Sequence, residues 1–80
     1  MENSKPPIEQ LTERMMEARG IDYQTAWEAL KLYLDGIDDE TFLLEIKRIE
    51  NVQIFRYLWS MGLNRRRQLI VTDFWNGLVQ

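Results

Sequence analysis

Gly20-Ile21-Asp22 is the first of three similar tripeptides that predict how this chain folds; the others are Gly36-Ile37-Asp38 and Gly62-Leu63-Asn64. In each one, the glycine can adopt the left-handed conformation that ends a helix. The Asp or Asn two positions later can accept a hydrogen bond from the free N–H groups of the next helix. The aliphatic residue between them can pack back onto that helix. We therefore expect short helices joined by tight turns at all three places.

The segments between these turns carry apolar residues at the spacing of one helix face. The first helix is predicted to begin near Pro7, because proline suits the first turn. Its apolar face is formed by Ile8, Leu11, Met15 and Ala18. The second helix, over residues 23–34, has the widest apolar face, and we expect it to lie centrally. The third helix follows Asp38 and the last follows Asn64.

Residues 50–62 have two interpretations. They either continue the third helix or begin a fourth helix capped by Asn51. A single helix over residues 38–61 would be long for a domain of this size, and the apolar pattern changes phase within it. We therefore predict a break. Because no segment alternates as a strand does, the sequence predicts an all-α fold: a compact orthogonal bundle of four to five short helices joined by tight Gly-aliphatic-Asp/Asn turns.

The length of 80 residues is enough for one small domain, which we place at residues 7–80. Residues 1–6 are polar apart from Met1 and the first of two adjacent prolines, and are expected to form a short disordered lead-in. The start of the chain lacks the basic and apolar regions of a signal peptide. The longest nearly apolar stretch, residues 54–63, is far shorter than the roughly 20 residues that span a bilayer. We therefore expect a cytoplasmic protein with no membrane partner.

Composition argues against catalysis. The sequence contains no cysteine and no histidine, so thiolate and imidazole nucleophiles, bases and metal ligands are excluded. Ser4, Ser60 and the threonines consequently have no histidine to activate them. Asp73 precedes Phe74-Trp75 and is the one carboxylate in an apolar sequence neighbourhood, but we expect it to be solvated. We predict that the protein is not an enzyme, needs no cofactor and binds no small-molecule substrate.

An acidic cluster surrounds the second tripeptide. It consists of Asp35, Asp38, Asp39 and Glu40. A calcium loop needs acidic ligands at alternating positions and a closing glutamate, which this segment lacks. Asp38 is better explained as a helix cap and the next two residues as first-turn acids. We therefore predict no metal site.

The basic run Arg65-Arg66-Arg67 is unusual because it occupies the first turn of a predicted helix, where the helix dipole disfavours cations. Three explanations stay open. The acidic first helices can neutralise the run internally, or an acidic protein partner can bind it. Alternatively, the helix, the Gly62 turn and the arginine-led helix resemble a helix-turn-helix layout for nucleic acid.

The segment from Ile54 to Met61 is apolar on nearly all sides. A small bundle can cover one face of such a helix but seldom both. Either this helix is central, or part of it forms a partner-binding surface. We name Arg56, Tyr57 and Trp59 as its candidate anchors, because aromatic and arginine side chains dominate binding energy at interfaces. A homodimer is the simplest form of this hypothesis.

Two segments resemble known helical families. Residues 15–21 (MMEARGI) followed by residues 26–30 (AWEAL) are similar to the start of a ubiquitin-associated domain, over less than a third of the chain. The second half is similar to one helix pair of the HEAT type. The helix predicted over residues 23–34 is longer than the first pattern has, and HEAT stacks need about three repeats. No residue role is therefore transferred from either family.

The net charge of −3 conceals two unlike halves. Residues 1–40 contain four basic and ten acidic residues, which gives −6, whereas residues 41–80 contain six and three, which gives +3. Such asymmetry favours interaction with another molecule or with a second copy. We predict a small intracellular, non-catalytic protein–protein interaction or regulatory module that uses Arg56, Tyr57, Trp59, Arg65, Arg66 and Arg67. The alternative is a nucleic-acid-associated regulator that uses the arginine-led helix.

Overall fold

A computed structural model describes residues 5–79, which form five α-helices and no strand. The helices are α1 (Pro7–Glu17), α2 (Ile21–Gly36), α3 (Asp39–Ile46), α4 (Gln53–Trp59) and α5 (Arg65–Val79). The Cα radius of gyration is 12.2 Å, close to the roughly 12 Å expected for a compact domain of this length. The predicted compact all-α bundle is confirmed.

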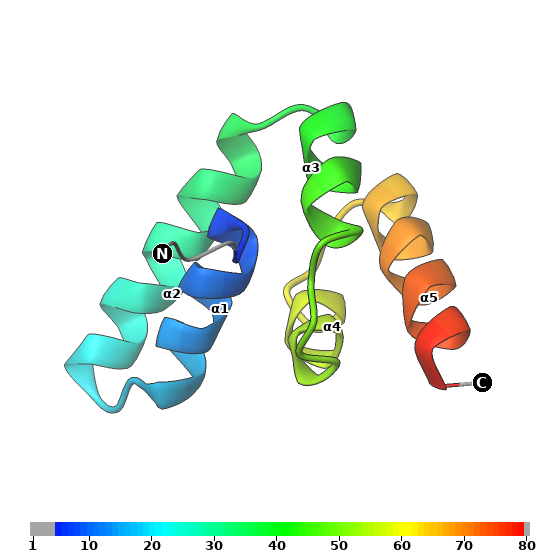
Figure 1. Cartoon of the computed structure of the whole chain (residues 1–80). Helices are drawn as coiled ribbons and strands as arrows, with labels where there is room; N and C mark the ends of the chain where they lie inside the picture. Colours follow the sequence, from blue (N-terminus) through cyan, green and yellow to red (C-terminus); the bar gives the residue numbers. More distant parts are fainter. Residues whose placement is uncertain (1–4, 80) are drawn as a thin grey trace.

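The helices are arranged around α4 (Figure 1). α1 and α2 form an antiparallel pair at one side of the molecule, and α5 lies at the other side. α1 contacts α2, α3 and α4, while α5 contacts α3 and α4. The short helices α3 and α4 therefore connect the first helix pair to the last helix.

The hydrophobic core contains residues from every helix. Its fully or nearly buried members are Ile8, Met15, Ala26, Leu30, Leu34, Phe42, Ile46, Ile49, Ile54, Phe55, Leu58 and Val71. α4 has only seven residues, yet it supplies three of these side chains, Ile54, Phe55 and Leu58. Such a short helix depends on this packing for its stability, because an isolated helix of two turns does not form in water.

The prediction that the second helix lies centrally is wrong. α2 lies at the edge of the bundle (Figure 1) and leaves Ile21 and Leu32 largely exposed, with 85% and 73% of their surfaces accessible. The physical reason is that α2 packs chiefly against α1, and only its C-terminal half also meets α3 and α5, through Tyr33 and Leu34. The centre is occupied instead by α4.

The three tripeptides form tight turns, but only in part by the predicted mechanism. Asp38 and Asn64 are caps: their Oδ1 atoms accept from Thr41 N at 2.8 Å and from Arg67 N at 2.9 Å. Gly62 has the positive φ, 76°, expected after a helix. Gly36 does not, because it is the last helical residue of α2.

The first tripeptide differs most from the prediction. Gly20 has φ 59° and ψ −126°. These are the angles of the first central residue of a type II′ turn, and not those of the left-handed residue that ends a helix. α2 begins directly after it, at Ile21, so Asp22 lies within the first turn and does not cap the helix. Asp22 still carries its negative charge at the helix N-terminus, where the dipole favours it.

The predicted break between the third and fourth helices is confirmed, because α3 ends at Ile46 and α4 begins at Gln53. The N-cap position of α4 is Val52, which makes no side-chain cap, so the prediction that Asn51 caps this helix is wrong by one position. Asn51 lies just before it, and its Oδ1 atom accepts a hydrogen bond from Gln53 N at 3.0 Å. Of the predicted lead-in, residues 1–4 lie outside the described residues. Pro6 is buried, and the Lys5 ammonium pairs with Glu13 at 3.0 Å.

Across residues 5–79, no helix combines the length and the apolar character needed to cross a bilayer.

Candidate functional site

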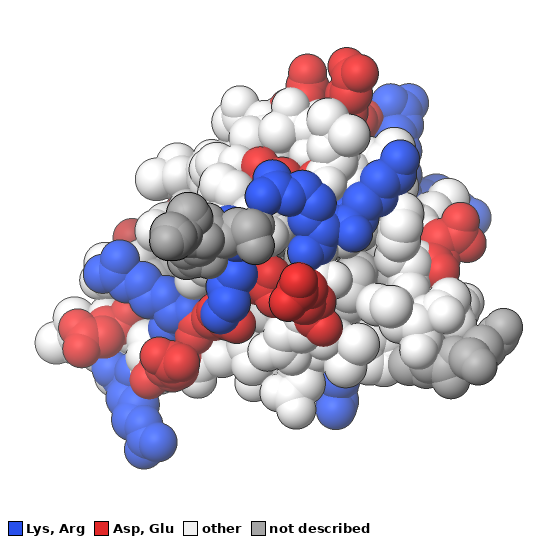
Figure 2. Space-filling model, viewed as in Figure 1, with Lys and Arg blue, Asp and Glu red and all other residues white. Residues whose placement is uncertain are grey.

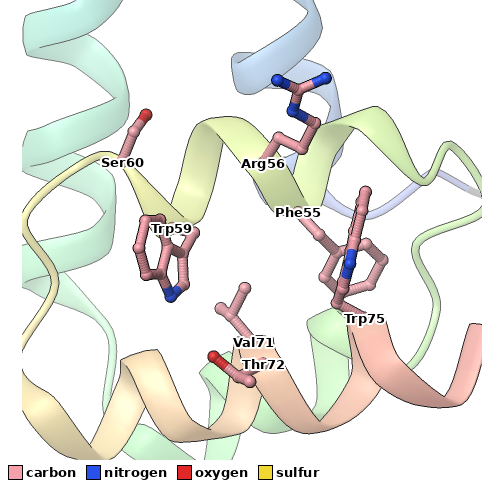
Figure 3. Close-up of a pocket in the computed structure, with 7 residues that line it drawn as sticks. All are labelled: Phe55, Arg56, Trp59, Ser60, Val71, Thr72 and Trp75. Atoms are coloured by element: carbon pink, nitrogen blue, oxygen red, sulfur yellow. The ribbon is translucent and has the colours of Figure 1, made fainter. Parts of the chain in front are cut away.

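A groove of about 530 Å³ lies between α4 and α5. It is lined by Phe55, Arg56, Trp59, Ser60, Val71, Thr72 and Trp75. In Figure 3, the aromatic rings of Phe55 and Trp59 extend from α4 toward α5, and Val71 and Trp75 extend back from α5. The two helices thus form the walls, and the aromatic side chains are distributed between them. We call this feature the α4–α5 groove.

The aromatic side chains of the groove differ in burial. Phe55 is 1% exposed and its ring meets that of Trp75 edge to face, with 6.5 Å between ring centroids and 64° between planes. This is a favourable geometry for two aromatic rings. Trp59, by contrast, is 58% exposed. Phe55 and Val71 therefore form a fixed floor, whereas Trp59 is an uncovered wall.

Arg56 and Ser60 form the outer edge of α4, one helical turn apart. In Figure 3 their polar ends are turned away from α5. The same two residues also line a second hollow of about 370 Å³, together with Gln53 and Tyr57. Ser60 Oγ donates to the Tyr57 carbonyl at 2.9 Å. Arg56 and Ser60 are consequently the ridge between the aromatic groove and this hollow, and Tyr57 lies beyond the ridge.

The polar atoms of the groove are mainly hydrogen-bond donors. The arginine guanidinium and the two indole N–H groups can only donate, and the hydroxyl groups can do both. None of the seven lining residues is a carboxylate. The groove is therefore chemically suited to an occupant that brings apolar groups and hydrogen-bond acceptors.

The arginine run of the sequence lies outside the groove, and its three members have different environments. The Arg67 side chain is only 11% exposed, and its Nε donates to Asp39 Oδ1 at 2.8 Å. Its two terminal nitrogens donate to the carbonyls of Leu34 and Ile37, each at 2.6 Å. The guanidinium also lies 4.9 Å from the centroid of the Phe42 ring, a cation–π contact.

Arg67 therefore caps the C-terminus of α2, a helix whose own last turn contains no basic residue. Unpaired carbonyls and the negative end of the helix dipole both favour a cation there. These contacts agree with the first of the three explanations for the basic run, which is that the run is neutralised within the chain. All three guanidinium nitrogens of Arg67 have partners within the fold.

Arg66 and Arg65 are more accessible. The Arg66 side chain is 77% exposed and pairs with Asp39 at 2.8 Å. Arg65 is exposed, and no ion pair joins it to another residue between 5 and 79. The hydrogen bonds from Arg67 and Arg66 hold the pKa of Asp39 below its ordinary value of 3.8. Of the three arginines, Arg65 is thus the one without an ion pair among residues 5–79, and Arg66 is exposed although paired.

Two glutamates, one on α1 and one on α3, are buried in the bundle. Glu45 of α3 is 7% exposed, and its Oε1 accepts from Ile8 N at 3.1 Å. Its Oε2 accepts from the Tyr33 hydroxyl. Burial, followed by this hydrogen bond and the carboxylate charge, raises the pKa of Tyr33 to about 12. α1 has no side-chain cap of its own, so Glu45 caps it from α3.

Glu9 of α1 is 1% exposed, and its Oε2 accepts from Asn51 N at 3.1 Å, just before α4. Its Oε1 is buried without a hydrogen-bond partner among residues 5–79. Glu9, Glu45 and Arg67 thus have one property in common: each is a charged side chain that pairs with the backbone at or near the end of another helix. We call these three residues the interhelical caps.

Of the six predicted site residues, the structure brings together Arg56 and Trp59 in the groove, with Tyr57 in the adjoining hollow. It separates them from Arg65, Arg66 and Arg67. The sequence analysis missed Phe55, Val71, Thr72 and Trp75 as lining residues. Their spacing contained the signal, because Phe55 and Trp59, and likewise Val71 and Trp75, are four residues apart and share a helix face.

The charged side chains do not form a single large patch on the face shown in Figure 2, where both signs are interspersed. On this face acidic side chains lie in front of α4, whereas the area between them and the C-terminal half of α5 is largely uncharged. No group of three or more His, Cys, Asp or Glu side chains within the described part of the chain could hold a metal ion. Asp73 is exposed.

Comparisons with protein-family models, with curated proteins and with solved structures gave no match for this chain.

Proposed function

We propose that this protein is a small, non-catalytic protein-interaction module and that the α4–α5 groove is its binding surface. The observation that carries the proposal is the exposure of Trp59, 58%, above a floor that is itself fully packed. A large aromatic side chain held at the wall of an apolar groove costs free energy in water and gains it when a partner covers the groove.

The dimensions and composition of the groove support this use. Its volume of about 530 Å³ lies within the roughly 300–1,000 Å³ of binding pockets. Grooves between two helices bind amphipathic helices, which insert apolar side chains from successive turns. Trp59, Tyr57 and Arg56 belong to the residue types that contribute most to binding at interfaces.

The same residues support binding over catalysis. Activating a nucleophile or moving a proton needs a base placed beside the reacting group. The groove offers two hydroxyl groups, from Ser60 and Thr72, and its lining includes neither a carboxylate nor another base. Ser60 Oγ already donates to a backbone carbonyl.

Selection of peptides from a random display library tests the proposal, because such a selection needs no identified partner. We expect peptides that bind the folded wild-type protein to lose binding to Trp59→Ala. The matched control is Leu32→Ala, which removes another largely exposed apolar side chain, from α2. Peptides that bind Trp59→Ala as well as wild type, or no enriched peptides at all, would contradict the proposal.

A second candidate function is association with nucleic acid. The observation in its favour is the exposure of Arg65 and Arg66 in the first turn of α5. Its support is weaker than the sequence suggested, because Arg67 is engaged in the α2 cap. This function predicts retardation of DNA or RNA at low salt, falling steeply as salt is raised. It also predicts weaker retardation for Arg65→Ala than for wild type.

A further inference from the structure

We infer that the occupant of the α4–α5 groove is an amphipathic helical segment of another protein, with carboxylates flanking its apolar side chains. This inference rests on the proposed function and adds the chemistry of the partner. It follows from three properties of the groove: its apolar floor, the donor character of its polar atoms and the charge of its lining residues.

The floor determines the apolar part of the partner. Phe55 and Val71 are each 1% exposed, and Trp75 is held against Phe55 by the edge-to-face contact. Trp59 lies one helical turn from Phe55 along α4, as Trp75 lies one turn from Val71 along α5. The apolar surface therefore extends for at least one turn along both helices. A partner helix with apolar side chains at positions i, i+3, i+4 and i+7 matches such an elongated surface.

The polar atoms determine the rest of the partner. The guanidinium of Arg56 and the indole N–H groups of Trp59 and Trp75 are donors only. For the described residues, no hydrogen bond involves any of these three groups. When a partner covers both the groove and the ridge that Arg56 forms beside it, each of these donors needs an acceptor, since an unsatisfied buried donor is costly. Carboxylates satisfy this need best, because hydrogen bonds between charged groups are the strongest.

The charge of the groove lining points the same way. Arg56 is the one cation among the seven lining residues, which include no carboxylate, whereas Arg66 and Arg67 of α5 lie outside the groove and pair with Asp39. Interfaces place potentials of opposite sign against each other, which speeds association and rejects partners of like charge. A symmetric dimer through this groove would instead bring two copies of Arg56 into one interface, with no carboxylate from either lining to pair with them. Charge complementarity therefore favours an acidic segment of a different protein over a second copy.

The test uses the full chain and two synthetic peptides of about four helical turns. Both peptides have leucine and phenylalanine at i, i+3, i+4 and i+7; one has glutamate at the flanking positions and its twin has lysine. Binding is measured by tryptophan fluorescence and by calorimetry. We expect the acidic peptide to bind at least about tenfold more tightly than the basic twin. Arg56→Gln should reduce this preference, and Trp59→Ala should abolish binding of both peptides.

Circular dichroism of each variant establishes that it is folded, and Leu32→Ala serves again as the surface control. The inference is overturned if the basic twin binds as tightly as the acidic peptide, or if Arg56→Gln leaves the preference unchanged. It is also overturned if neither peptide binds, or if sedimentation reveals a dimer that Trp59→Ala dissociates, since a second copy would then be the occupant. In each case the display selection still decides separately whether the groove binds peptides at all.

Discussion

The interhelical caps and the α4–α5 groove differ in which side chains the fold buries. The caps contain charged side chains that are buried, and the groove contains a large apolar side chain that is exposed. Glu45 and Arg67 are charged, yet they are mostly buried and have backbone partners on other helices. Trp59 is apolar, yet more than half of it is exposed. Burying a charge is tolerated only with such partners, and exposing a large aromatic group is explained most simply by a partner that covers it. The comparison distinguishes residues that stabilise the fold from residues that we propose to act in binding.

The largest expected effect tests whether Phe55, in the floor of the groove, stabilises the fold while Trp59, in its wall, does not. Phe55→Ala should lower the free energy of unfolding by about 4 kcal/mol, because it removes a fully buried aromatic side chain. Trp59→Ala, on the same helix, should lower it by less than about 1 kcal/mol, as surface substitutions do. Urea denaturation followed by circular dichroism measures both values. Equal losses would mean that Trp59 belongs to the core.

The next effect tests the cap of α1. Glu45→Ala should cost about 3 kcal/mol, because it leaves Ile8 N and the Tyr33 hydroxyl without their acceptor in the interior. Glu40→Ala, in the exposed first turn of the same helix, is the control and should change stability by less than about 0.5 kcal/mol. A similar effect of both substitutions in urea denaturation would show that Glu45 does not act as a cap.

A smaller effect separates two neighbouring arginines. Arg67→Ala should lower the free energy of unfolding by about 2 kcal/mol, since the Leu34 and Ile37 carbonyls lose a charged donor. Arg65→Ala, two positions earlier, should change it by less than about 0.5 kcal/mol. Urea denaturation followed by circular dichroism measures both values. If the order were reversed, Arg67 would be the residue that is free for a ligand.

Acid should weaken the Asp39 contact with these arginines. Its pKa in the folded protein is below the ordinary 3.8, so its contribution to stability is complete above about pH 4 and is lost as the pH falls through the folded value. We expect the urea midpoint to fall between pH 7 and pH 3, and by less in Arg67→Ala than in wild type. An equal fall in both proteins would show that the Arg67 contact with Asp39 has no role in acid sensitivity.

The smallest effect concerns one of the three tyrosines. Because burial and Glu45 raise the pKa of Tyr33 from 10 to about 12, its contribution to stability is present below pH 10 and is lost as the pH rises from 10 to 12. Ultraviolet absorbance of tyrosinate should accordingly show one late ionisation, near pH 12. Tyr33→Phe should remove this late step. A late step that persists in Tyr33→Phe would assign it to another residue.

Much of the fold was predictable because its signals are local. The Asp38 and Asn64 caps each join residues three positions apart, and the break before α4 follows from the phase of the apolar pattern and from Asn51. The first turn was predicted less well. Whether Gly20 ends one helix or directly begins the next depends on a ψ angle that the residue type leaves free, since glycine accepts both conformations.

The candidate site was only partly predictable. The excess of apolar residues in residues 54–61 marked Arg56, Tyr57 and Trp59 as surface candidates. It did not reveal that Val71 and Trp75 of α5 form the facing wall. Which helix lies opposite another depends on how all five helices pack together, and a periodic pattern states only that a face is apolar, not what covers it.

The sequence by itself determined the helical class, the positions of the turns, the absence of cysteine and histidine, and the opposite charges of the two halves. These properties depend on residue type and on neighbours within a few positions. Only the tertiary structure decided the roles of the arginines and glutamates. Arg67 meets the Leu34 carbonyl 33 positions away, and Glu45 meets Ile8 N 37 positions away. Such partners are set by packing, because a buried charge is stable only where the fold brings a complementary group to it.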